Sequence, residues 1–243
     1  LTVVGVAFWV AVGVFGVTFG WDDEVPSIAI IPFDNKGDKE DEFYAYSISS
    51  ELISDVTGAG LIRVAGLKDI EKLEYQTLNY NEISEKLLVR YVAQGTLWKV
   101  DSVFQLSMEL YDTKSSELLW SESWQKEWNE LASIKSNLAD NILTTLKVST
   151  KQEITETYTA NAEAYEYYLR ARYIDNNSIN LEDIDIARGL YQKAINLDDN
   201  ILKAKNNLAW TYFYSGDYDK AKEIYAFTIK QAKAIGNKRE MGN

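Results

Sequence analysis

The chain has 243 residues, of which 46% are hydrophobic and 26% charged, so wholesale disorder is not expected. It contains no cysteine and no histidine, which excludes Ser-His-Asp and Cys-His catalysis, imidazole or thiolate metal sites, and disulfides. Its 25 basic and 37 acidic residues give a net charge of −12, which disfavours binding to nucleic acid. We predict no catalytic residue, no metal site and no cofactor.

The first 21 residues carry no charge and predict a transmembrane helix. At about 1.5 Å per residue, residues 1–21 span roughly 31 Å, which matches a hydrocarbon core of about 30 Å. A signal peptide is the alternative, but its apolar core is usually about 7–15 residues long, and no small-x-small cleavage site precedes Asp22. Trp21 is placed where an interfacial aromatic residue anchors such a span.

The flank of this segment predicts its orientation. Acidic residues occupy positions 22–24 and the first basic residue is Lys36, which is typical of a non-cytoplasmic flank. We therefore expect residues 22–243 outside the cytoplasm and, because the chain begins with Leu, a missing N-terminal part inside it. Small residues at a spacing of four are candidate contacts between two such helices in a homodimer, namely Ala7 with Ala11 and Gly16 with Gly20.

After a linker at residues 22–26, the segment 27–150 alternates between strand and helix patterns. Short apolar runs predict strands at residues 28–33 and 61–65. Spacings of three and four predict helices at residues 45–56 and 83–88. Period-two alternation and short turns then predict an antiparallel meander at residues 91–100, 103–111 and 118–125. A helix at residues 131–146 completes an α/β or α+β layer.

Several stretches of this segment resemble TolB-like N-terminal domains. The run PSIAIIPFDN at residues 26–35 is similar to the opening of that family. Residues 90–96 (RYVAQGT) and 110–120 are similar to its middle strands, and the closing helix lies where the family has one. The resemblance covers residues 26–148. The chain departs from it at Tyr46, where relatives tend to carry glycine, and at residues 57–60, where they often have proline.

Beyond residue 151 the strand pattern gives way to a period of 34 residues. Ala187 matches Ala221 and Tyr191 matches Tyr225 at this spacing. Small and aromatic residues at a 34-residue period are typical of tetratricopeptide repeats, in which each repeat is a helical hairpin. The preceding repeat, at roughly residues 163–196, has a longer turn and a looser first helix. We predict an all-α tetratricopeptide-repeat solenoid at residues 151–243, truncated at its C-terminus.

The first helices of such a stack form its inner surface, which predicts a face that binds a protein or peptide. Lys203, Asn206, Trp210 and Phe213 share one side of a first helix. Asn206 suits a peptide backbone, and Trp210 is a typical anchoring residue. Packing against a neighbouring helix is the alternative; it is favoured for Phe213, and both interpretations stay open for Trp210.

Two other groups of residues have simpler interpretations. The tryptophans near the meander are expected to pack on the sheet, with a sugar-binding platform as the alternative. They are Trp98, Trp120, Trp124 and Trp128. The acidic cluster at residues 38–42 lacks the ligand spacing of a calcium loop and is expected to be a solvated loop.

A TolB-like domain followed by tetratricopeptide repeats resembles the extracytoplasmic half of bacterial membrane signalling proteins. The resemblance implies a non-catalytic sensing and protein-interaction region in the periplasm, anchored in the bacterial inner membrane by residues 1–21. It also implies a cytoplasmic effector outside this fragment, either an adenylate/guanylate cyclase or a winged-helix regulator. The alternative is a membrane-tethered cell-envelope scaffold with no effector domain. A hydrolase using paired carboxylates is a third hypothesis, but 37 acidic residues make such pairs inevitable.

Overall fold

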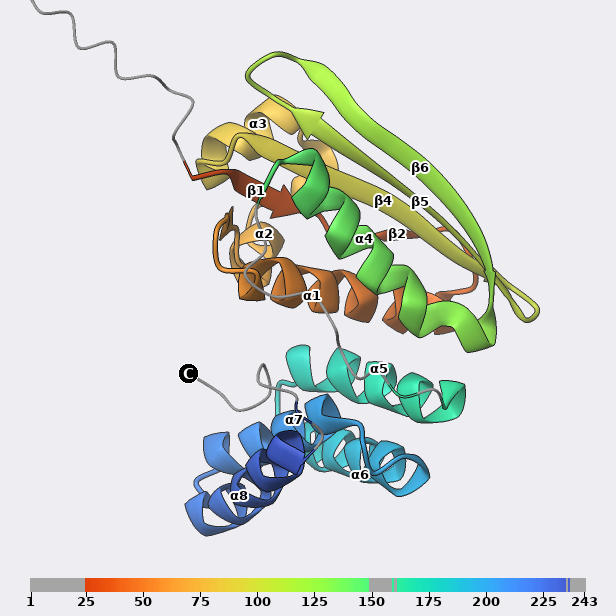
Figure 1. Ribbon diagram of the computed structural model, residues 1–243, viewed down its shortest axis with the longest axis vertical. Helices are drawn as coiled ribbons and strands as arrows, with labels where there is room; N and C mark the ends of the chain where they lie inside the picture. Colours follow the sequence, from red (N-terminus) through yellow and green to blue (C-terminus); the bar gives the residue numbers. More distant parts are fainter. Residues whose placement is uncertain (1–24, 149–158, 160, 235, 237–243) are drawn as a thin grey trace, which may run out of the picture.

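A computed structural model describes residues 25–148, 159, 161–234 and 236. The described chain forms an α+β part, followed by a helical part made of four helices (Figure 1). The strands of the α+β part are β1 (Ser27–Ile30), β2 (Asp34–Asn35), β3 (Arg63–Val64), β4 (Tyr91–Val100), β5 (Val103–Asp112) and β6 (Glu117–Glu127). Its helices are η2 (Lys39–Asp41), α1 (Glu42–Gly58), α2 (Leu67–Glu71), η3 (Tyr75–Thr77), α3 (Tyr80–Leu87), η4 (Trp128–Glu130) and α4 (Leu131–Thr145).

The sheet is mixed, with the strand order β3-β1-β4-β5-β6 and with β2 paired to β4. Strand β1 runs parallel to both β3 and β4, whereas β4, β5 and β6 form the predicted antiparallel meander. The period-two alternation of β5 explains its position, because one face of the strand is buried. The buried side chains are Phe104, Leu106, Met108 and Leu110. The sequence pattern did not reveal β2 or α2.

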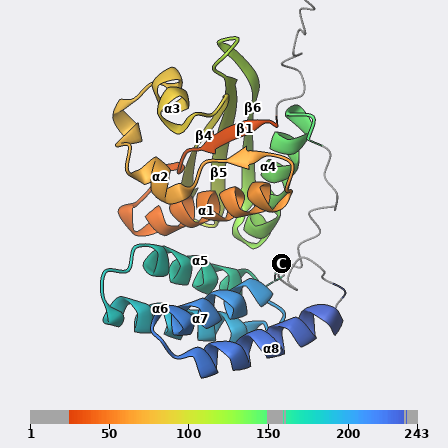
Figure 2. The same cartoon turned by 90° about the vertical axis from the view of Figure 1, so that its left-hand side faces the viewer.

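Helix α1 is buried on two sides. Its predicted apolar stripe, which includes Ile48, Leu52 and Val56, belongs to the core beneath the sheet. Its other side carries Glu51 and Asp55, and these two side chains are equally buried. The reason is that α1 lies between the sheet and the first helix of the helical part (Figure 1, Figure 2).

The helical part consists of two hairpins, α5 (Ala162–Asn176) with α6 (Leu181–Leu197), and α7 (Leu202–Tyr214) with α8 (Tyr218–Ala234). Burial repeats from one hairpin to the next. Ala187 and Ala194 of α6 are buried, as are the residues 34 positions later in α8, Ala221 and Thr228. In the first helices the matching spacing is 40 residues, from α5 to α7. The buried pairs are Ala164 and Ala204, Tyr165 and Lys205, Tyr168 and Leu208, Leu169 and Ala209, and Ala171 and Thr211. The difference between the two spacings reflects the longer first hairpin.

The expected fold class and location require a correction. Among the described residues, none of the helices combines the length and the apolar character needed to cross a membrane. Helix α1, for example, carries Glu51 and Asp55 within its length, so it does not offer an uncharged surface to lipid. On this finding the prediction of a transmembrane helix is wrong, and so is the prediction of a single-pass inner-membrane protein. Residues 1–21, including the candidate contacts Ala7, Ala11, Gly16 and Gly20, lie outside the described residues.

Candidate functional site

The four residues of the predicted binding face have different surroundings. Lys203 points into a buried ionic cluster, where its ammonium group lies 3.0 Å from Glu51 Oε2 and 2.9 Å from Asp55 Oδ1. Asn206 is half-buried. Trp210 and Phe213 are 45% and 43% exposed, and their ring centroids lie 5.4 Å apart. The structure therefore brings the two aromatic residues together at the surface. Lys203 instead belongs to the contact between α7 and α1.

Trp210 and Phe213 belong to a larger group of rings that we call the aromatic patch, formed by Trp210, Phe213 and Tyr214 of α7 and Tyr218 of α8. Tyr214 stacks on Trp210 with centroids 5.3 Å apart, and Tyr218 lies 5.3 Å from Phe213. Tyr214 is 77% exposed and Tyr218 is 63% exposed. Because these rings contact one another, they form a continuous aromatic surface at the end of the second hairpin.

A second feature joins the two parts of the molecule. We call it the charged junction: Glu51 and Asp55 of α1, Lys135 of α4, Arg172 of α5 and Lys203 of α7. The ammonium group of Lys135 lies 3.2 Å from Glu51 Oε2 and 2.5 Å from Asp55 Oδ2. The side chains of Lys135 and Asp55 are fully buried, and that of Glu51 is 2% exposed. Buried charges are tolerated only when they are paired in this way.

The electrostatics of the junction keep Glu51 ionised. Burial alone raises the pKa of this carboxyl group, but the positive charges of Lys203, Lys135 and Arg172 outweigh burial. The hydroxyl group of Tyr168 also donates a hydrogen bond of 2.6 Å to Glu51 Oε1. The result is a pKa of Glu51 well below its usual value.

Further hydrogen bonds extend the junction along α1 and α5. Ser47 Oγ donates to the carbonyl oxygen of Leu169 at 2.8 Å, and Arg172 Nη2 donates to Ser50 Oγ at 2.5 Å. At the other end of the interface, the ring of Tyr46 packs edge-on against that of Tyr173. Tyr46 thus contributes to the contact with the helical part.

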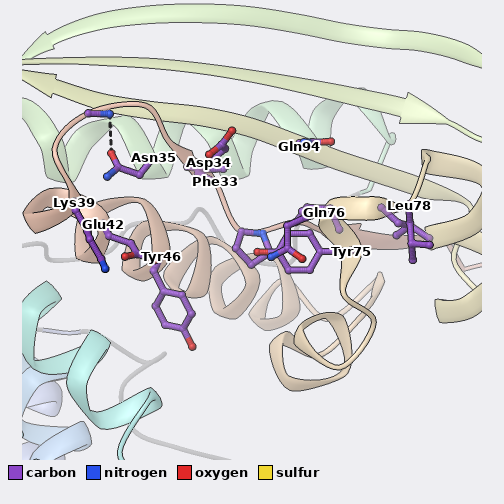
Figure 3. A pocket seen from close by; sticks show the side chains of 14 residues that line it. Phe33, Asp34, Asn35, Lys39, Glu42, Tyr46, Tyr75, Gln76, Leu78 and Gln94 are labelled. Atoms are coloured by element: carbon purple, nitrogen blue, oxygen red, sulfur yellow. Dashed lines mark hydrogen bonds between the residues drawn. The ribbon is translucent and has the colours of Figure 1, made fainter.

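A pocket of about 540 Å³ lies just beyond the carboxyl end of β1. Figure 3 shows Lys39, Glu42 and Tyr46 on one side of it and Tyr75, Gln76 and Leu78 on the other. The hydroxyl group of Tyr46 donates a hydrogen bond of 2.7 Å to Glu71 Oε1, which holds the Tyr46 side chain in place on its side of the pocket. No pattern in the sequence indicated this pocket, because η3, which forms one wall, has no clear periodicity.

The tryptophans of the meander mostly pack on the sheet. Trp120 and Trp124 lie 5.6 Å apart and pack against the core with Trp128. Trp128 Nε1 also donates to Glu166 Oε2 of α5 at 3.2 Å, so it too links the two parts. Trp98 of β4 is half-buried. Among the described residues, no group of three or more His, Cys, Asp and Glu side chains is arranged to hold a metal ion.

The sequence contained a weak signal for the junction. Helix α1 reads SISSELISD at residues 47–55, so the side opposite its apolar stripe combines serines with Glu51 and Asp55. Small serine side chains allow close approach of a second helix. Two acidic groups one turn apart favour the binding of cationic side chains. The partners could not be found in this way, because they come from three helices that are distant in the sequence.

These features define a class of protein in which a mixed α+β sheet unit is fixed to helical hairpins, with an aromatic surface at the far end. No family model matches the chain. The chain is similar to Putative adenylate cyclase 3 of Rhizobium meliloti (strain 1021), with 23% identity over 189 residues that cover 76% of this chain and 32% of that protein. The chain thus spans about a third of the length of this relative.

Parts of this chain also match solved structures, at low identity and low TM-score. TolB from Acinetobacter baumannii matches 51% of this chain and 29% of its own, with 19% identity and a TM-score of 0.39. PelC from Paraburkholderia phytofirmans matches 51% of this chain and 89% of its own, with 20% identity and a TM-score of 0.36. Lipoprotein GNA1162 from Neisseria meningitidis matches 49% of this chain and 99% of its own, with 16% identity and a TM-score of 0.35.

Proposed function

We propose that this chain is a non-catalytic, protein-binding region of a larger signalling protein, and that its partner binds the aromatic patch. In this account the helical hairpins are divergent tetratricopeptide repeats and the α+β part is TolB-like. The similarity to Putative adenylate cyclase 3 supports a nucleotide cyclase as the effector of the whole protein. The region would sense the presence of its partner and report it to that effector.

The observation that carries this proposal is the exposure of the aromatic patch. Tryptophan and tyrosine are enriched among the residues that dominate binding energy at protein interfaces. Single exposed apolar side chains are normal on a protein surface, but a contiguous cluster marks an interaction site. In the aromatic patch, Trp210 lies in ring contact with both Phe213 and Tyr214.

The charged junction supports the second half of the proposal, in which binding is reported to the rest of the protein. Helix α7 carries Trp210 near its end and Lys203 near its start, and Lys203 pairs with Glu51 and Asp55 of α1. A partner held at the aromatic patch is thus connected to the α+β part through one helix and a set of buried ion pairs. No flexible linker lies on this route within the described residues.

A photo-crosslinking experiment tests the proposal. A benzoylphenylalanine residue replaces Trp210 in the full-length protein, expressed in its own cell, and a second variant carries it at Lys222 of α8. Lys222 is exposed and lies outside the aromatic patch, so it is the matched control. We expect a discrete protein adduct at position 210 that is absent at position 222. The same products at both positions, or none at position 210, would contradict a partner at this surface.

A further inference from the structure

We propose that strand β6 pairs with β6 of a second copy of this chain, so that two sheets join edge to edge in a homodimer. The surface is separate from the aromatic patch, and the inference does not depend on the function proposed above. It rests on the open edge of β6, on the length of its regular part and on a charge pattern that is complementary to itself.

Strand β6 is the outermost strand at its end of the sheet (Figure 1). It pairs with β5 on one side, and within the described residues no backbone hydrogen bond reaches it from any other segment. The N–H and C=O groups that point away from β5 therefore form an unpaired edge. Such an edge is a template for another strand, which adds to the sheet through main-chain hydrogen bonds.

The edge is long enough for such pairing. Strand β6 has 11 residues, about twice the mean strand length of about 5–6 residues. Proline and lysine commonly protect edge strands, but β6 contains no proline and one lysine, Lys126. A bulge interrupts the strand near its start at Leu119, which has no counterpart on β5. Residues 120–127 then form a regular segment that a second strand can follow over about 26 Å.

One face of this regular segment carries a row of two aromatic and two charged side chains. Trp120, Glu122, Trp124 and Lys126 lie on the face of the sheet on which β5 carries its buried residues. Trp120 and Trp124 are half-buried, so part of each ring is accessible to a partner. Glu122 is exposed, and the side chain of Lys126 is 34% exposed. The row therefore offers both rings and charges to a neighbouring strand.

This row is complementary to itself. In an antiparallel pair related by a two-fold axis, the residues at equal distances on either side of the axis face each other. With Trp124 on the axis, Glu122 faces Lys126 of the second copy, and symmetry forms this ion pair twice. The two Trp124 side chains then face each other between the ion pairs. Opposite charges and aromatic pairs directly across strands stabilise a sheet.

Neighbouring positions of the axis lack this complementarity. An axis at Glu122 or at Lys126 places two like charges opposite each other, which is destabilising. An axis at Ser121, Ser123 or Gln125 leaves Glu122 facing a tryptophan instead of a cation. Because one segment supplies both halves of each ion pair, the pattern favours a second copy over an unrelated extended peptide.

Charge reversal tests the pairing, with sedimentation equilibrium of the full chain as the measurement. Lys126→Glu and Glu122→Lys each place like charges opposite each other twice, and each should weaken dimerisation about tenfold or more. The double variant Glu122→Lys/Lys126→Glu exchanges the two charges and should restore the wild-type affinity. Glu117→Lys is the matched control, because Glu117 is exposed on the same strand but lies before the bulge.

The single variants are expected to fold. Glu122 and Lys126 make exposed contacts within the chain, at 3.2 Å from Asn141 Nδ2 and from Glu130 Oε1, and such contacts contribute little to stability. A chain that stays monomeric, a dimer that survives both single reversals, or a double variant that does not restore dimerisation would overturn the proposal.

Cysteine cross-linking tests the register. The chain has no cysteine of its own, so single cysteines report only on the positions chosen. Ser123 faces Gln125 of the second copy in the proposed register, at a Cα separation of about 4.5–5.5 Å that suits a disulfide. Ser123→Cys chains mixed with Gln125→Cys chains should therefore form a disulfide-linked dimer. Ser121→Cys chains mixed with Gln125→Cys chains should not, and equal cross-linking in the two mixtures would contradict this register.

Discussion

At the scale of single residues, Gly95 of β4 shows how closely the α+β part is packed. A Cβ atom at this position would overlap the carbonyl oxygen of Ser107 on β5 and would lie 3.0 Å from the ring of Phe33. The space is therefore available only to glycine. The RYVAQGT stretch that resembles TolB-like domains includes this residue, and the structure supplies a steric reason for it.

We predict that Gly95→Ala destabilises the protein by about 1–3 kcal/mol, the usual cost of overpacking. Gly189 of α6 is the control, because no atom lies within 4 Å of the Cβ that alanine would add there. Gly189→Ala should be neutral or stabilising by up to about 1 kcal/mol, since alanine favours the helix. Urea denaturation measures both changes. Equal stability of Gly95→Ala and the wild type would show that the sheet is more loosely packed than described.

Glu51 gives the junction a defined dependence on pH. Its pKa in the folded protein is depressed, so its contribution to stability is fully present above the unfolded pKa of about 4.3 and is lost as the pH falls toward the folded value. We expect the free energy of unfolding of the wild type to fall more steeply below about pH 4.5 than that of Glu51→Gln. Urea titrations between pH 7 and pH 3 measure both slopes. Parallel curves would mean that Glu51 is not held ionised by its partners.

At the scale of elements, hydrophobic periodicity predicted the main strands and helices of the α+β part. The alternation in β5 and the apolar stripe of α1 each have one buried side that periodicity can detect. The short β2 and α2 were missed because two to five residues are too few to show a period. In the helical part, the 34-residue period found the buried alanines of α6 and α8, but it did not reveal the 40-residue spacing of α5 and α7.

The polar side of α1 shows the limit of this reasoning. A polar helix face normally indicates solvent, yet Glu51 and Asp55 are buried because Lys135, Arg172 and Lys203 neutralise them. These partners lie 80 to 152 positions away in the sequence, so no local sequence pattern predicts them. For the same reason Lys203 looked like part of an open binding face, although its ammonium group is paired with Glu51 and Asp55 of α1. The aromatic end of that helix remains the predicted partner surface.

At the scale of the whole molecule, we expect the α+β part and the helical part to open as one unit. Helix α1 is enclosed between the sheet and α5 (Figure 2), and the charged junction ties it to both α4 and α7. Removing one partner of a buried ion pair typically costs about 3–5 kcal/mol, because the remaining charge stays buried without compensation. Glu51→Gln should therefore separate the two parts energetically, because it removes the carboxylate that Lys135, Arg172 and Lys203 share.

Native-state hydrogen exchange, read by mass spectrometry on peptides from α1, α5 and α7, tests this claim most directly. In the wild type we predict that the slowest amides of the three helices open with the same free energy, within about 1 kcal/mol. In Glu51→Gln, α5 and α7 should exchange at a free energy clearly below that of α1, which keeps its contacts with the sheet. Helices that already exchange with different free energies in the wild type would contradict the account and show that the two parts open independently.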